Sequence, residues 1–123
     1  MINRRSGLRV PARLIVHQYD QHSQEHQVCM SFNLGTEGIY LYHRPEERVP
    51  HIVGLEFQIP GVPESIWARG EVRFSGRFGP YRGTGIAFTA MANRHWDRVQ
   101  DWVFDSRLEQ VRAALPWLLS KAA

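Results

Sequence analysis

Apolar and polar residues alternate along much of the chain, and this alternation predicts short β-strands. In one segment, Val28, Met30 and Phe32 share one face, while Cys29 and Ser31 share the other. The predicted strands cover residues 10–17, 28–32, 39–42, 53–59, 67–74 and 84–89. Six short strands at close spacing favour a small antiparallel barrel or sandwich, and we expect the barrel.

Polar, glycine-rich and proline-rich segments separate these strands. Residues 18–27 are almost wholly polar and predict a hairpin connection. The run from Asn33 to Gly38, Asn-Leu-Gly-Thr-Glu-Gly, interrupts extended structure with residues that accept a positive φ. Residues 45–50 and 75–83 are predicted loops, and the second of them is rich in glycine, arginine and aromatic residues.

A helical period replaces the alternation after Met91. The apolar residues with helical spacing are Trp96, Val99, Val103, Leu108, Val111, Leu115 and Leu118. Asn93 can cap a first helix, and Ser106-Arg107-Leu108-Glu109 fits a capping box that opens a second one, which Pro116 is expected to kink or restart. The later apolar residues either pack on the barrel or form a surface for a partner.

Length and composition indicate one globular domain. The chain has 123 residues, of which 43% are hydrophobic and 22% charged, close to globular averages. We expect a single domain in which residues 1–9 form a flexible arginine-containing arm, residues 10–90 the barrel and residues 93–121 the C-terminal helices. No stretch approaches the ~20 apolar residues of a membrane span, and no apolar signal segment follows the first charges, so we expect a cytoplasmic protein.

The charged residues indicate an anionic partner. The formal net charge is +3, and Lys121 is the only lysine, so nearly all cations are arginines. The planar guanidinium fork suits phosphates and the edges of guanine. Cys29 is the only cysteine, which excludes an internal disulfide and a cysteine-based structural zinc site. Its position in a strand predicts a buried, unreactive thiol.

Motifs for catalysis, metal binding and nucleic-acid binding are incomplete. The run His22-Ser23-Gln24-Glu25-His26 spells the H-x-x-E-H motif of zinc peptidases, but its polar flanks favour an exposed hairpin tip over a buried helix. The strand at Thr84 and Ile86 lacks the aromatic residues with which RNA-recognition motifs stack bases, and no phosphate-binding loop is present. We therefore expect no enzymatic activity, no metal site and no DNA or RNA partner.

Two further segments carry a more specific signal. Arg5 and Arg9 form an R-x-x-x-R segment before the first predicted strand, with Arg4 as an additional basic neighbour. Asn33 and Gly38 fit the first and last positions of a [D/N]-x-S-x-x-G turn after the second predicted strand.

In this order and spacing, the two segments resemble those of the PilZ domain family, whose members are receptors for cyclic di-GMP. Gly35 stands where the family's turn has a serine. Residues 10–14, 70–72 and 85–88 also resemble the family's strand pattern, and the likeness covers residues 4–104.

The resemblance implies a six-stranded antiparallel PilZ-like β-barrel with C-terminal α-helices, whose N-terminal arm closes over cyclic di-GMP. The ligand-binding residues that it implies are Arg4, Arg5, Arg9, Asn33, Gly35, Gly38 and Phe74. The arginines would bind phosphates and guanine edges, and Asn33 the N–H edge of guanine. The two glycines would let the backbone approach the ligand, and Phe74 would stack on a base.

We therefore expect a receptor or adaptor whose surface changes when cyclic di-GMP binds and which then regulates an unidentified partner protein, in motility or exopolysaccharide control. The alternative is a PilZ-like adaptor that binds no nucleotide and acts through its C-terminal helices and arginine-rich face. A homodimer through these helices is a further arrangement consistent with their apolar stripe.

Overall fold

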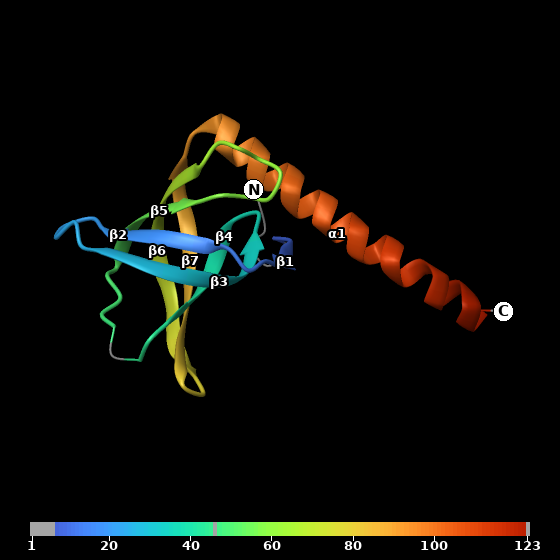
Figure 1. Cartoon of the computed structure of the whole chain (residues 1–123), viewed down its shortest axis with the longest axis horizontal. Coiled ribbons are helices and arrows are strands. Elements are labelled where there is room, and N and C mark those ends of the chain that lie inside the picture. The colour runs from blue at the N-terminus through green and yellow to red at the C-terminus, as the bar shows by residue number, and fades with distance from the viewer. Residues whose placement is uncertain (1–6, 46, 123) are drawn as a thin grey trace.

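The computed structural model describes residues 7–45 and 47–122, which form seven strands and one long helix (Figure 1). The elements are β1 (Arg9–Pro11), β2 (Ile15–Asp20), β3 (His26–Gly35), β4 (Gly38–His43), β5 (Ile52–Phe57), β6 (Ile66–Phe78), β7 (Tyr81–Met91) and α1 (Asn93–Ala122). All neighbouring strands are antiparallel, in the order β3-β2-β5-β6-β7-β4, and β4 pairs again with β3. This pairing closes a six-stranded barrel, to which β1 adds a short strand beside β3, so the predicted barrel is confirmed.

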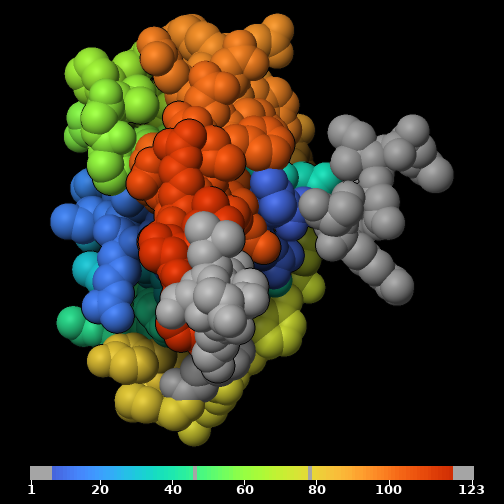
Figure 2. Space-filling model, turned by 90° about the vertical axis from the view of Figure 1, so that its right-hand side faces the viewer, coloured from blue at the N-terminus to red at the C-terminus, as the bar shows by residue number. Residues whose placement is uncertain are grey.

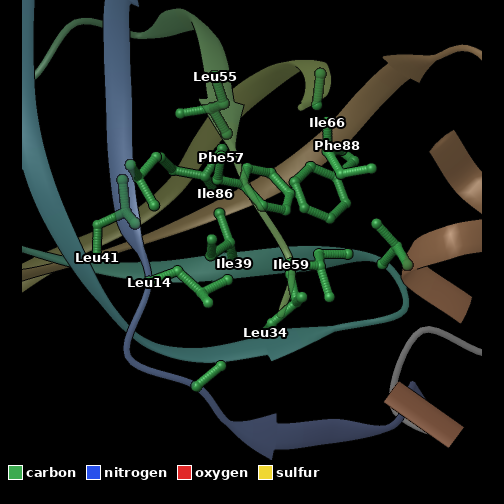
Figure 3. Packing of buried hydrophobic residues seen from close by; sticks show 14 of the residues in the cluster. Leu14, Leu34, Ile39, Leu41, Leu55, Phe57, Ile59, Ile66, Ile86 and Phe88 are labelled. Atoms are coloured by element: carbon green, nitrogen blue, oxygen red, sulfur yellow. The ribbon is translucent and has the colours of Figure 1, made fainter. Parts of the chain in front are cut away.

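Because apolar and polar residues alternate, every second side chain of a strand points into the barrel. In β5, for example, Val53, Leu55 and Phe57 are buried, and the residues between them are partly exposed. Figure 3 shows Phe57 beside Phe88 of β7, and their rings stack with centroids 6.2 Å apart. Burial of these apolar side chains supplies the main driving force for closing the sheet.

The predicted strand at residues 10–17 is two strands, β1 and β2, that follow one another along β3. The buried Ser31 explains the break. Its hydroxyl donates a hydrogen bond to the carbonyl of Ala12 at 2.6 Å and accepts one from the N–H of Leu14 at 2.8 Å. The Ser31 hydroxyl thus satisfies the carbonyl of Ala12 and the N–H of Leu14, which in a continuous strand would bond to the backbone of the neighbouring strand.

The predicted loop at residues 75–83 is the end of a long hairpin. Strands β6 and β7 stay paired as far as Phe78 and Tyr81, and the chain reverses at Gly79, whose φ of +58° suits glycine. The prediction was wrong because residues 75, 77 and 81 are all exposed, so this part of the hairpin carries no apolar alternation that the sequence could reveal.

The two predicted C-terminal helices are one continuous helix, α1. It passes through Ser106 without using the predicted capping box, and it includes Pro116. A capping side chain accepts hydrogen bonds from N–H groups that have no preceding helical turn. Ser106 lies in mid-helix, where carbonyls of the preceding turn already accept these bonds. Within the described part of the chain, no helix combines the length and apolarity needed to cross a membrane.

Candidate functional site

The described part of the first segment, residues 7–9, meets the turn from Asn33 to Gly38 at one end of the barrel. Strand β1 lies along the last residues of β3, where Arg9 pairs with Gly35 and Pro11 with Asn33. The N–H of Thr36 then donates to the carbonyl of Leu8 at 3.0 Å. The turn between β3 and β4 is therefore held directly against the residues before β1. In Figure 2 the start of the described chain, drawn in dark blue, lies beside α1.

Next to this turn is a pocket of about 530 Å³. Its size is typical of sites for small ligands. Of the predicted ligand-binding residues, Arg9, Gly35, Gly38 and Phe74 line it. The other lining residues were not predicted, and among them are Glu37, Tyr40, Arg73, Thr89 and Trp96. Arg4 and Arg5 lie outside the described residues.

Arg9 is the first residue of β1, and the predicted flexible arm would have included it. Its guanidinium donates a hydrogen bond to the Tyr40 hydroxyl at 2.7 Å and lies 4.4 Å from the centroid of the same ring. The contact combines a hydrogen bond with a cation–π interaction. It orients one end of Arg9 while the fork still has other N–H donors for an anion.

The two motif glycines lie where backbone segments approach most closely. A β-carbon at Gly35 would lie 2.9 Å from the carbonyl oxygen of Leu8 and 3.0 Å from Cγ of Arg9. A β-carbon at Gly38 would overlap the carbonyl of Ile86 on β7. Gly35 thus permits β1 to lie on β3, and Gly38 permits β4 to pair with β7.

Asn33 lies beside the pocket but is not part of its lining. It pairs with Pro11 on one side and Tyr40 on the other. Its side-chain Oδ1 is buried and has no hydrogen-bond partner among the residues that the structure describes. A buried acceptor of this kind is rare, because burial removes the hydrogen bonds that water would provide.

A bulge in the β6–β7 pairing shapes the far wall of the pocket. The register shifts between Val72 and Phe74, and the consecutive residues Arg73 and Phe74 are both exposed and both line the pocket. In a regular strand, two neighbours would point to opposite faces. Arg73 also pairs with Glu71, with 3.7 Å between Nη2 and Oε2.

Helix α1 closes the site from the other side. Trp96 lines the pocket and meets Phe88 edge to face, with ring centroids 6.0 Å apart. One turn further along, the Gln100 side chain donates to the carbonyl of Thr36 at 2.9 Å. The helix therefore fixes the turn between β3 and β4, and a change in this turn would be transmitted to α1.

A polar cluster joins two buried residues of the barrel, Cys29 and His43, to Glu47 in the loop after β4. Sγ of Cys29 is 3.5 Å from Nδ1 of His43, which is 3.6 Å from a carboxylate oxygen of Glu47, so the three could supply ligands to a metal ion. Burial, helped by the charge of Glu47, raises the pKa of the Cys29 thiol to about 12, and desolvation lowers the pKa of His43. At neutral pH the thiol keeps its proton, as expected of an unreactive thiol, and a metal would have to displace that proton.

The H-x-x-E-H run lies at the predicted hairpin tip. His22 is in the turn, and His26 begins β3, so the two do not share a helix. Instead, His26 contacts His17 of β2, with 2.8 Å between ring nitrogens. This arrangement does not have the geometry of a zinc peptidase.

No protein-family model matches this sequence, and no curated protein matches it. Solved structures do match. MotI/DgrA, an inhibitor of motility from Bacillus subtilis, has a TM-score of 0.77 and 18% identity, over 88% of this chain and 53% of its own. The PilZ domain of Escherichia coli YcgR with c-di-GMP has a TM-score of 0.65 and 11% identity, over 91% of this chain and 98% of its own.

PlzA of Borreliella burgdorferi, in complex with c-di-GMP, has a TM-score of 0.62 and 8% identity, over 83% of this chain and 52% of its own. The chain thus spans about half the length of MotI/DgrA and of PlzA. At these identities the likeness shows the fold. It is a PilZ-like six-stranded antiparallel barrel with one C-terminal helix.

Proposed function

We propose that this chain is a non-enzymatic receptor that binds cyclic di-GMP in the pocket beside β1. The observation that carries the proposal is the convergence of Arg9, Gly35, Gly38 and Phe74 on one pocket of suitable size. All four are residues to which the resemblance to the PilZ family assigns ligand binding. Two matched structures, the YcgR PilZ domain and PlzA, contain c-di-GMP, which supports this choice of ligand.

The lining offers groups for each part of the ligand. Arg9 and Arg73 provide forked donors for phosphates or for the O6 and N7 atoms of guanine, and we expect Arg4 and Arg5 to add to them. The rings of Phe74 and Trp96 provide faces on which a guanine can stack. The two arginines in the lining also favour a dianionic ligand electrostatically.

Binding would alter the surface around β1. Tyr40 holds one end of the Arg9 guanidinium, so a ligand that binds its other N–H donors acts directly on β1, the strand that carries Arg9. Any movement of β1 reaches the turn at Thr36 through its bond to Leu8, and reaches α1 through Gln100. We propose that a partner protein in motility or exopolysaccharide control reads this altered surface.

Isothermal titration of the full chain tests the proposal. We expect a dissociation constant in the micromolar range or tighter for cyclic di-GMP. Cyclic di-AMP has the same backbone and charge but lacks the O6 acceptor, so we expect it to bind more weakly. Absence of heat with cyclic di-GMP at high protein concentration would contradict the proposal and favour the alternative, an adaptor that binds no nucleotide.

Restoring the serine of the family motif is expected to weaken binding. A side chain at position 35 must push against the carbonyl of Leu8 and the side chain of Arg9, and this displaces β1. We expect Gly35→Ser to lower affinity about fivefold. Gly35→Ala introduces the same β-carbon without the hydroxyl and serves as the control. If Gly35→Ser binds more tightly than the natural chain, the ligand contact of the hydroxyl outweighs the steric effect.

A further inference from the structure

Helix α1 carries two apolar stripes on different sides. The first stripe is Trp96, Val99 and Val103, which pack against the barrel, and both valines are fully buried. The second, called here the outer stripe, consists of Phe104, Leu108, Val111 and Leu115, which are 52%, 49%, 48% and 43% exposed. At about 100° per residue, the outer stripe is centred about 120° around the helix from the first.

The chain's own barrel therefore cannot cover the outer stripe. Figure 1 shows the C-terminal half of α1 extending beyond the barrel, and Figure 2 shows the helix from this end. Phe104 follows the buried Val103 directly, yet half of its side chain is exposed because it points to the other side. A row of four large apolar side chains in water is typical of an interaction surface.

The spacing of the outer stripe indicates what covers it. Its members are separated by four, three and four residues, which places Phe104 and Val111 at d positions of a heptad and Leu108 and Leu115 at a positions. A helix that packs on a globular core has a wider apolar face. A narrow seam of a and d positions fits another helix with the same seam.

We propose that the outer stripe packs antiparallel against the outer stripe of a second copy of this chain. In this two-fold arrangement Phe104 lies against the partner's Leu115, and Leu108 lies against the partner's Val111. Symmetry repeats both layers, so four layers of apolar contacts form from one stripe. The dimer would bury all four side chains of the outer stripe and would require no change in the barrel.

Charges beside the seam select the antiparallel orientation. Asp105 and Arg112 occupy e positions, and Arg107 and Ala114 occupy g positions. In a parallel pair, g faces e, so Arg107 would lie beside the partner's Arg112, with repulsion on both sides. In the antiparallel pair, e flanks e and g flanks g. Asp105 then lies beside the partner's Arg112, twice, and Arg107 beside the partner's Ala114.

Sedimentation equilibrium of the full chain without ligand tests the proposal. The seam spans only about two heptads, so we expect a dimer that dissociates on dilution in the micromolar range. Leu108→Asp is expected to give a monomer. Its control, Gln110→Asp, adds the same charge at an exposed position outside the seam and is expected to leave the dimer intact. Circular dichroism checks that both variants retain the fold.

A charge reversal tests the orientation. Arg112→Asp places this aspartate beside the partner's Asp105 in the antiparallel pair, and we expect about tenfold weaker dimerisation. Adding Asp105→Arg to the same chain restores the opposite charges and is expected to restore the affinity. In a parallel pair, Arg112→Asp would instead strengthen the dimer, because it would face the partner's Arg107.

The outcomes separate clearly. A chain that stays monomeric at every concentration, or a Leu108→Asp variant that dimerises as well as the natural chain, overturns the proposal. Stronger dimerisation of Arg112→Asp overturns the antiparallel orientation. These measurements need no nucleotide, so their result does not depend on whether the pocket binds cyclic di-GMP.

Discussion

Replacement of Gly38 with alanine is expected to lower the free energy of unfolding by about 3 kcal/mol. The new β-carbon would overlap the carbonyl oxygen of Ile86, lying 3.2 Å from its carbonyl carbon and 3.3 Å from Cα of Ala87. All of these are backbone atoms of β7, so no side chain can rotate away. The strand β4 must move, and with it the pairing of β4 with β7 that helps to close the barrel.

Gly54→Ala is the matched control for this prediction. Gly54 also lies in a barrel strand, β5, but a β-carbon there would meet only Cβ of Tyr19, at an ordinary 3.7 Å. We expect its stability to change by less than about 1 kcal/mol, in either direction. Urea unfolding of both variants measures the difference. Equal stabilities would show that β4 adjusts to a side chain at position 38 without cost.

Most of the barrel could be predicted because its strands alternate. Segments such as residues 53–59 bury one face, and that requirement is visible in the sequence as a period of two. The division of residues 10–17 could not be predicted, because it depends on Ser31, which is distant in sequence and close only in the folded barrel. The continuous helix was missed because a capping box favours a helix start only where the chain before it is not already helical.

The motifs mark part of the pocket lining but not all of it, and the motif residue Asn33 lies outside the lining. Arg9, Gly35 and Gly38 belong to the two motifs, and all three line the pocket. Arg73 could not have been predicted, because a bulge in β6 brings it there. Tyr40 had a readable signal: it alternates with the buried Ile39 and Leu41 and follows the glycine-containing turn, so it had to lie on the outer face beside that turn.

Arg9→Ala is expected to weaken cyclic di-GMP binding at least about tenfold. Paired bonds from a guanidinium to a phosphate or a guanine edge contribute about 1.5–3 kcal/mol, and alanine removes all of them. Arg9 is exposed, and its contact with Tyr40 is on the surface, so we expect the fold to survive the substitution. Titration calorimetry measures the affinity, and thermal unfolding confirms that the variant is folded.

Arg13→Ala separates a specific contact from a general effect of charge. Arg13 is exposed, lies four residues along the same segment and is outside the lining of the pocket. Both substitutions lower the net charge by one unit, so a long-range attraction for the dianionic ligand would weaken equally in both variants. A loss confined to Arg9→Ala requires direct contact. Equal losses would mean that the pocket attracts anions without holding the ligand through Arg9, and the binding mode proposed for β1 would be wrong.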